Sequence, residues 1–306
     1  MKTVITYKNA DLDCVASAYA YSEFLNKSGI QSNYYIGGIV QEEVNVICSY
    51  FGIELSKLND DISNNEIIVV DTSTYSSIDF INPDQVVEIL DHHLRSNDEY
   101  KNAKITIEQI GAVCTMIAEK FKNSGIPISD SSAILLYYGI ISNTVNLKSK
   151  VTTNRDLLMI DWLKSQCSKI DESFISSFFK EKTKFDISDL RRAMEIEEKF
   201  TLGSDELIIG QLEVVGAREF LEKYKSEIDR HLDAAREQYG VSIMFMNIID
   251  IFDGYHIIYS PYDDTVDYLK KFSLNLEGGI LFEDKIVLRK EIKKYLRDTL
   301  DNRSFL

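Results

Sequence analysis

The chain is poor in cysteine, in histidine and in long hydrophobic runs. Its four cysteines form no Cys-x-x-Cys pair, so we expect reduced, buried thiols and neither a zinc knuckle nor a disulfide framework. No apolar run approaches the length of a membrane span, and the N-terminus shows no signal-peptide core. We therefore expect a soluble, cytoplasmic protein without a membrane partner.

Positive charge is also scarce, since 34 basic residues stand against 49 acidic ones and give a formal net charge of −15. Nucleic-acid binding is driven by neutralisation of phosphates, so this balance argues against an extended nucleic acid as partner. An acidic protein that handles an anion must do so locally, with metal ions or with a few well-placed basic residues.

The length of 306 residues favours two domains, because a single core usually stops growing below this size. We place the first domain at residues 1–185 and the second at 186–306. The stretch KEKTKFDISD, residues 180–189, is charged and lacks apolar periodicity, which is typical of a linker.

The pattern of the first domain predicts an α/β fold with a doubly wound, mainly parallel sheet flanked by helices. The second domain is expected to be a smaller α/β domain with a mixed sheet. The strands predicted in chain order are Lys2–Thr6, Ser32–Ile36, Glu66–Val70, Val86–Leu90, Ala103–Glu108, Glu206–Val214, Ser242–Ile251, Gly254–Ser260 and Ile280–Phe282. The predicted helices are Asp11–Lys27, Glu42–Phe51, Gly111–Asn123, Ser129–Asn143, Arg155–Lys164, Glu172–Lys180, Ala217–Gln238, Thr265–Phe272 and a final helix after Lys290.

The strand at Val86–Leu90 leads directly into Asp91, His92 and His93, which include two of the four histidines of the chain. Ligands of open α/β sheets collect outside the carboxyl ends of the strands. These residues are therefore candidates for chemistry, although a pair of half-exposed loop histidines is the alternative.

Two earlier strand ends also carry acids. Asp11 and Asp13 follow the first strand, where one of them could instead cap a helix, and Asp71 comes directly after the strand Glu66–Val70. Carboxylates with one or two histidines suit Mn²⁺, Mg²⁺ or Co²⁺. A two-metal site needs a bridging carboxylate, and Asp71 is the natural candidate.

Four segments resemble the motifs of the DHH phosphoesterases. They are YKNADLD, VVDTS, ILDHHLR and GIISNTVNLKS, which begin at residues 7, 69, 89 and 139. The match is closer to the branch with a DHHA2 second domain, which comprises the manganese-dependent family II inorganic pyrophosphatases and the Prune-like exopolyphosphatases. IEQIGAVCT, FTLGSDELIIGQLEVV, MFMNIIDIFDGYHIIY and LRKEI extend the resemblance over essentially the whole chain.

The resemblance implies a metal site of up to two ions, with Mn²⁺ expected and Mg²⁺ or Co²⁺ as alternatives. It places Asp11 and Asp71 on one ion, and Asp13, Asp71 and His92 on the other. The family has a histidine where this chain has Tyr7. A phenol with a pKa near 10 is a poor ligand at neutral pH unless a metal displaces its proton.

A second ligand position is altered as well, because Asn143 stands where the family has an aspartate. An amide oxygen can coordinate a metal, but it brings no negative charge. Tyr7 and Asn143 thus remain candidate ligands, and each weakens the site.

The resemblance also implies a substrate clamp and an active site in the cleft between the domains. His93 is expected to contact the phosphate, and Arg289 and Lys290 match the basic pair of the family. A lysine near the start of the second domain completes the set; Lys184 and Lys182 are both candidates, and we take Lys184.

The leading hypothesis is a metal-dependent phosphohydrolase that cleaves a phosphoanhydride or phosphoester with a metal-activated water, like an inorganic pyrophosphatase or polyphosphatase. Asp71, His93, Arg289 and Lys290 are the catalytic candidates, and the partner is a small phosphorylated substrate. One alternative is a catalytically weakened relative that binds a phosphorylated metabolite or nucleotide. Another is an oligonucleotide phosphodiesterase. A homodimer is consistent with the resemblance.

Overall fold

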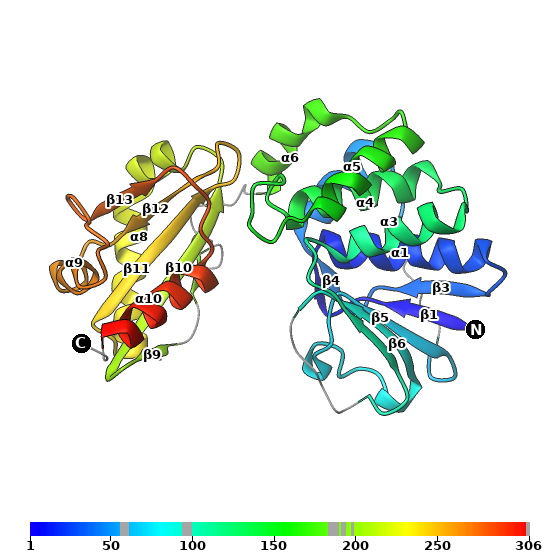
Figure 1. The fold of residues 1–306 in the computed structure, drawn as a ribbon, viewed down its shortest axis with the longest axis horizontal. Helices are drawn as coiled ribbons and strands as arrows, with labels where there is room; N and C mark the ends of the chain where they lie inside the picture. The colour runs from blue at the N-terminus through cyan, green and yellow to red at the C-terminus, as the bar shows by residue number, and fades with distance from the viewer. Residues whose placement is uncertain (56–60, 94–99, 183–189, 191–193, 197–198, 304–306) are drawn as a thin grey trace. The chain divides into compact units, whose positions relative to one another are not determined.

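The computed structural model describes residues 1–55, 61–93, 100–182, 190, 194–196 and 199–303 (Figure 1). The chain divides into two compact units, Met1–Lys182 and Thr183–Leu306. Both the expected boundary at residue 185 and most of the expected linker lie outside the described residues, as does Lys184.

The first unit is built on a parallel sheet of five strands in the order β3-β1-β5-β6-β7. Its strands are β1 (Lys2–Ile5), β3 (Ser32–Tyr35), β5 (Glu66–Val70), β6 (Val86–Asp91) and β7 (Lys104–Ile107). Residues Ile67, Ile68, Val69 and Val70 of β5 are fully buried, as a central parallel strand requires. β2 (Asn9–Ala10) and β4 (Ile39–Val40) form a separate short pair.

Helices cover one face of this sheet, as Figure 1 shows. They are α1 (Leu12–Lys27), α2 (Glu42–Phe51), α3 (Val113–Ser124), α4 (Asp130–Asn143), α5 (Asn154–Gln166) and α6 (Ile175–Lys182). The other face packs against a cluster that includes Ile78 and Ile81, from the segment with the 3-10 turns η1 (Tyr75–Ser77) and η2 (Pro83–Gln85), and Tyr100, which lies between β6 and β7. A third 3-10 turn, η3 (Glu172–Phe174), precedes α6.

The sheet is parallel, as predicted, and its strand order reverses direction between β1 and β5. Ligand sites in such sheets form at this switch point, where loops diverge from neighbouring strand ends. The loops after β1, β5 and β6 carry Asp11 and Asp13, Asp71, and His92 and His93. The topology therefore brings the three predicted strand ends together.

The described residues of the second unit form a six-stranded mixed sheet, in which β10 and β11 pair in parallel and the other pairs are antiparallel. Its strands are β8 (Glu195–Ile196), β9 (Phe200–Leu202), β10 (Asp205–Val214), β11 (Ile243–Asp250), β12 (Tyr255–Tyr259) and β13 (Ile280–Glu283). The helices are α8 (Ala217–Tyr239), α9 (Asp263–Lys270) and α10 (Arg289–Arg303). The sheet has a hydrophobic cluster on each face, one containing Leu232 of α8 and the other Leu296 of α10.

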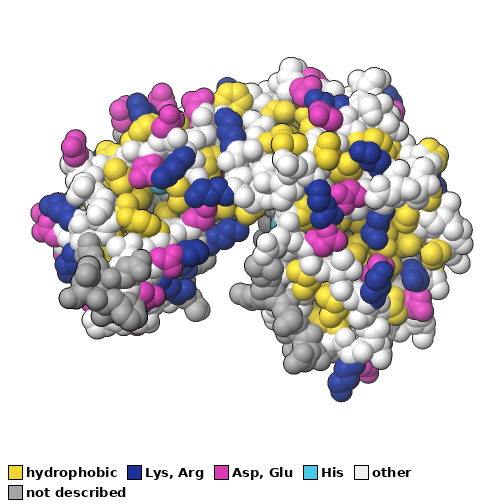
Figure 2. Space-filling view, viewed as in Figure 1, with side chains coloured by type: hydrophobic (Ala, Val, Ile, Leu, Met, Phe, Trp, Pro, Cys, Tyr) yellow, Lys and Arg dark blue, Asp and Glu magenta, His cyan; other side chains and the backbone are white. Residues whose placement is uncertain are grey.

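Most predicted elements match the structure within two residues. The short strands β8 and β9 were not predicted, and Arg289 and Lys290, expected before the final helix, are its first two residues. Acidic and basic side chains are interspersed on the visible face of both units (Figure 2). Among the described residues, none of the helices has the length and hydrophobicity to cross a membrane.

Candidate metal centre

Asp13 lies in the first turn of α1 with 1% of its surface exposed. Its two carboxylate oxygens accept hydrogen bonds from the backbone nitrogens of Val113 at 2.9 Å and Cys114 at 2.8 Å, at the start of α3. The carboxylate thus faces the positive end of a helix, which stabilises its charge. Each oxygen keeps a further lone pair for another partner.

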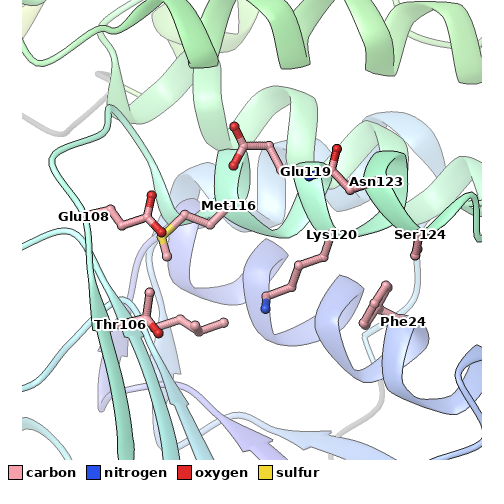
Figure 3. Close-up of a pocket in the computed structure, with 9 residues that line it drawn as sticks. Phe24, Thr106, Glu108, Met116, Glu119, Lys120, Asn123 and Ser124 are labelled. Atoms are coloured by element: carbon pink, nitrogen blue, oxygen red, sulfur yellow. The ribbon is translucent and has the colours of Figure 1, made fainter.

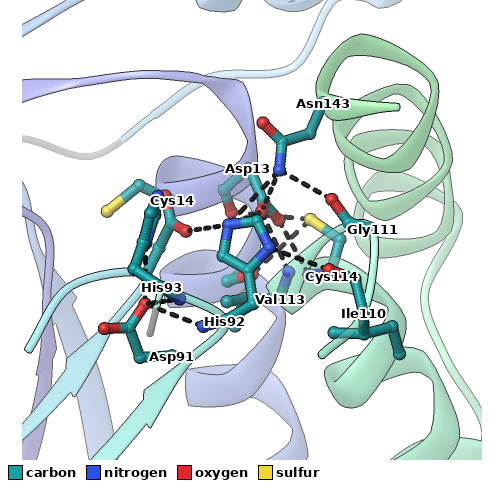
Figure 4. A network of polar contacts seen from close by, with 12 residues as sticks. Asp13, Cys14, Asp91, His92, His93, Ile110, Gly111, Val113, Cys114 and Asn143 are labelled. Atoms are coloured by element: carbon teal, nitrogen blue, oxygen red, sulfur yellow. Dashed lines mark hydrogen bonds and ion pairs between the residues drawn. The ribbon is translucent and has the colours of Figure 1, made fainter. Parts of the chain in front are cut away.

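His92 follows β6, and its ring orientation is fixed by the carbonyl oxygen of Ile110, 3.0 Å from Nδ1 (Figure 4). A carbonyl can only accept, so Nδ1 carries the proton in the neutral ring. Nε2 points toward Asp71 Oδ1 at 3.3 Å and Asp13 Oδ2 at 4.0 Å, and it offers a lone pair once the ring is neutral. A histidine whose other nitrogen donates to a carbonyl is the usual arrangement of a metal ligand.

Asp71 directly follows β5 with a left-handed backbone, φ 63°, and 2% exposure. A non-glycine residue in this region is uncommon and is often found at functional sites. Its Oδ1 accepts no hydrogen bond from the described residues. A buried carboxylate oxygen that faces His92 Nε2 fits a cation between the two groups, which would displace the proton that Nε2 carries in the metal-free protein.

His93 is held differently, since its Nδ1 lies 2.8 Å from Asp91 Oδ1. The same oxygen accepts the backbone nitrogens of His92 and His93, so Asp91 fixes both histidines. The side chain of His93 is 60% exposed, which leaves Nε2 open to solvent or a ligand. Asp71, His92 and His93 offer ligand atoms within 4.8 Å of one another.

Asp11 is the N-cap of α1, and its Oδ1 accepts the backbone nitrogen of Cys14 at 2.9 Å. The alternative interpretation of this aspartate as a helix cap is therefore confirmed, and its second oxygen is not used by the cap. The hydroxyl of Tyr7 accepts the backbone nitrogen of Asp11 at 3.4 Å. Burial, with the charges of Asp11 and Asp71, raises the pKa of the Tyr7 phenol well above its usual value, so the phenol is protonated at neutral pH.

Asn143 is the last residue of α4, and its Nδ2 points into the site (Figure 4). Nδ2 donates to the carbonyl oxygen of Gly111 at 2.8 Å and to Asp13 Oδ2 at 3.2 Å, and lies 3.4 Å from His92 Nε2. The carbonyl can only accept, which fixes the amide with its nitrogen toward the carboxylate. Metal ligation by Asn143 would require this amide to turn over, so its assignment as a ligand stays a prediction.

Gly111 allows the loop before α3 to come this close. A Cβ atom at this position would lie 2.6 Å from Thr144 Cγ2 and 2.7 Å from Asp156 Oδ2. Asp156 Oδ2 accepts the backbone nitrogen of Gly111, and its Oδ1 accepts the hydroxyl of Thr115 at 2.5 Å. Glycine is thus required because the backbone approaches two side chains directly.

The acids of the site are crowded with negative charge. Burial, then the charges of Asp13 and Asp11, raise the pKa of Asp71 well above its usual value. Burial, Glu43 and Asp13 raise the pKa of Asp11 to about 6. Burial lowers the pKa of His92, but contact with Asp71 and the charge of Asp13 raise it to about 10. Excess negative charge around His92 Nε2 and the Asp71 carboxylate is the environment that a divalent cation relieves.

The remaining predicted residues are the basic ones, Arg289 and Lys290 in the second unit and Lys182 in the first. Arg289 and Lys290 begin α10, and the backbone nitrogen of Arg289 donates to Gln211 Oε1 at 2.8 Å. Lys182 belongs to the first unit, where its Nζ lies 2.8 Å from Glu43 Oε2. The location of the basic pair relative to the metal centre stays a prediction.

Sequence reasoning missed Glu43, Ser142 and Asp156 as parts of this site. Each of them hydrogen-bonds to a residue that is far away in the sequence, and none directly follows a strand, so no local pattern marks them. Asp91 lay within the DHH segment, but its function as the acceptor that orients His93 became clear only from the structure.

A separate open pocket of about 410 Å³ lies beside α1, α3 and β7 (Figure 3). It is lined by Phe24, Leu90, Thr106, Glu108, Met116, Glu119, Lys120, Asn123 and Ser124. None of the predicted ligands lines it, and its carboxylates Glu108 and Glu119 are paired with Arg155. The candidate metal centre is thus distinct from this pocket.

Comparison with known proteins supports the resemblance of the motifs. Residues 2–140 match the model of the DHH family, N-terminal domain. The manganese-dependent inorganic pyrophosphatase of Bacillus subtilis is 24% identical over 293 residues, which cover 94% of each chain. A Clostridium acetobutylicum protein named as a probable enzyme of the same kind is 27% identical over 290 residues, or 93% of each.

The fold is similar to that of a Methanococcus jannaschii protein whose crystal structure is described as that of a putative family II inorganic pyrophosphatase. That structure has a TM-score of 0.70 and 24% identity, with 98% of this chain and 100% of the other covered. An exopolyphosphatase-related protein of Bacteroides fragilis has a TM-score of 0.51 and 14% identity, with 98% and 92% covered. Residues 2–140 are therefore similar to the DHH family, N-terminal domain, and the chain shows distant homology over nearly its full length to manganese-dependent inorganic pyrophosphatases.

Proposed function

We propose that this protein is a metal-dependent phosphohydrolase that cleaves a phosphoanhydride or phosphoester of a small substrate, like an inorganic pyrophosphatase or polyphosphatase. One observation carries the proposal: His92 Nε2 faces a buried oxygen of Asp71 at 3.3 Å, beside Asp13. The distant homology to manganese-dependent pyrophosphatases supports the same reaction class.

The donor set fits a divalent cation, with Mn²⁺ expected and Mg²⁺ or Co²⁺ as alternatives. Asp13, Asp71 and His92 would hold one ion, and Asp11 with Asp71 would hold a second. Such ions neutralise phosphoryl charge and lower the pKa of water in enzymes of this kind. Tyr7 would bind a metal only after its phenol lost its proton, which its raised pKa opposes.

The chain's own groups supply the rest of the chemistry. The exposed ring of His93 is held by Asp91 through Nδ1, and as an imidazolium it can donate from Nε2 to a phosphoryl oxygen. Arg289 and Lys290 supply two positive charges at the start of α10 that suit a phosphate group.

Asn143 favours one alternative, a catalytically weakened relative that binds a phosphorylated metabolite or nucleotide. Its amide nitrogen donates to Asp13, where a carboxylate would add a charged ligand. A site with fewer charged ligands binds metals less tightly. Hydrolysis, which needs the metal, would then fall, while the basic residues could still bind the phosphorylated compound.

The deciding experiment measures phosphate release from pyrophosphate, short polyphosphate and a nucleotide panel, with Mn²⁺, Mg²⁺, Co²⁺ or EDTA. We expect metal-dependent release that Asp71→Asn abolishes. Asp161→Asn is the matched control, because Asp161 is exposed on α5. The absence of release with every metal, together with substrate-induced stabilisation of the protein, would refute hydrolysis and support the binding protein.

A further inference from the structure

Glu43 is a buried carboxylate that joins four segments of the first unit. It lies in the first turn of α2 with 3% exposure. Its Oε1 accepts the backbone nitrogen of Leu12 at 2.8 Å. Its Oε2 accepts the hydroxyl of Ser142 at 2.5 Å and the ammonium of Lys182 at 2.8 Å. Lys182 Nζ also donates to Ser142 Oγ at 2.8 Å.

The contacts of Glu43 are adjacent to candidate ligands on two elements. Leu12 stands between Asp11 and Asp13, and Ser142 precedes Asn143. A shift of Glu43 would therefore move the start of α1 and the end of α4. Small displacements of ligand-bearing backbone change metal affinity, because coordination distances are narrow.

Helix stability alone explains this arrangement poorly. Asp11 already caps α1 by accepting the backbone nitrogen of Cys14. Burying a carboxylate and an ammonium costs desolvation free energy that their attraction often only offsets, so a buried ion pair is weak support for stability. The three partners of Glu43 instead specify where the segments that carry them lie.

We propose that Glu43 is a positioning residue for the candidate metal centre, with Lys182 as its fixed counter-ion rather than a substrate-binding cation. The proposal rests on the proposed function, because it concerns the same metal centre. Removal of Lys182 leaves the carboxylate of Glu43 buried without its cation, so Glu43 moves and releases Leu12 and Ser142. A neutral pair at both positions restores the arrangement, since glutamine can still accept from Leu12.

The test compares Mn²⁺ affinity in the wild type, Lys182→Met and the double variant Glu43→Gln/Lys182→Met, by electron paramagnetic resonance of free Mn²⁺. We expect Lys182→Met to bind Mn²⁺ about tenfold more weakly and the double variant to recover to within about threefold. Lys164→Met is the matched control, because Lys164 pairs with Asp161 and Glu172 at the surface of the same unit. Its Mn²⁺ affinity should equal that of the wild type.

Hydrogen exchange without metal gives a second readout. The amides of residues 11–14 and 142–144 should exchange faster in Lys182→Met and normally in the double variant. Unchanged Mn²⁺ affinity in folded Lys182→Met would overturn the proposal, even if its free energy of unfolding fell. A wild type that binds no Mn²⁺ would refute the proposed function, which requires a metal. Independently of metal binding, normal hydrogen exchange in Lys182→Met would refute the positioning of these segments by Glu43.

Discussion

Asn143→Asp tests the altered ligand position most directly. In the metal-free protein the new carboxylate would face Asp13 Oδ2 where Nδ2 now lies 3.2 Å away. Two full charges at this separation repel by roughly 5 kcal/mol at an effective dielectric constant of about 20. The variant also loses the hydrogen bond to Gly111, worth about 1 kcal/mol. Because protonation relieves part of the repulsion, we expect the free energy of unfolding to fall by about 2–4 kcal/mol.

With metal present, the carboxylate added by Asn143→Asp should stabilise the metal-bound protein, because it becomes a charged metal ligand. We expect Mn²⁺ to bind about 10–100-fold more tightly, which corresponds to about 1.4–2.8 kcal/mol. At saturating Mn²⁺ the variant should regain much of the stability lost without metal, since ligand binding adds to the free energy of unfolding.

Urea unfolding followed by the fluorescence of Trp162, the single tryptophan, measures both effects in EDTA and in Mn²⁺. Asn154→Asp is the control, because Asn154 is exposed at the start of α5 and gains the same charge. The reasoning is refuted if Asn143→Asp matches this control in stability without metal and wild type in Mn²⁺ affinity. That result would mean that the amide of Asn143 does not face Asp13.

Two further predictions concern protons and substrate. His92 has a pKa of about 10 and must lose a proton to bind metal, so Mn²⁺ affinity should rise about tenfold per pH unit, for each proton released, between about pH 6.5 and 9. Calorimetry in buffers of different ionisation enthalpy measures how many protons are released. A Mn²⁺ affinity that does not change with pH would contradict this prediction. Arg289→Ala should raise KM for a phosphorylated substrate about 10–100-fold, since a charged hydrogen bond is worth about 1.5–3 kcal/mol, and should leave Mn²⁺ affinity unchanged. Arg297→Ala, further along α10, is its control, and lost metal binding in Arg289→Ala would show that the assignment is wrong.

The sequence alone determined the alternation of strands and helices and the identity of the candidate ligands. Strands such as Glu66–Val70 are short apolar segments, and the acid that follows each one is specified by its immediate neighbours. The DHH motifs are likewise contiguous, so Asp13, Asp71 and His92 could be named before any contact was known. Their convergence followed from the expected parallel sheet.

Tertiary structure decided how these groups are oriented. The direction of the Asn143 amide depends on the carbonyl of Gly111, 32 residues away, and the tautomer of His92 depends on Ile110. Glu43 contacts Leu12, Ser142 and Lys182 from separate elements, and no local pattern specifies such a set. Residue types and their local periodicity fix which groups are available, whereas hydrogen-bond directions and burial arise only when distant segments pack against one another.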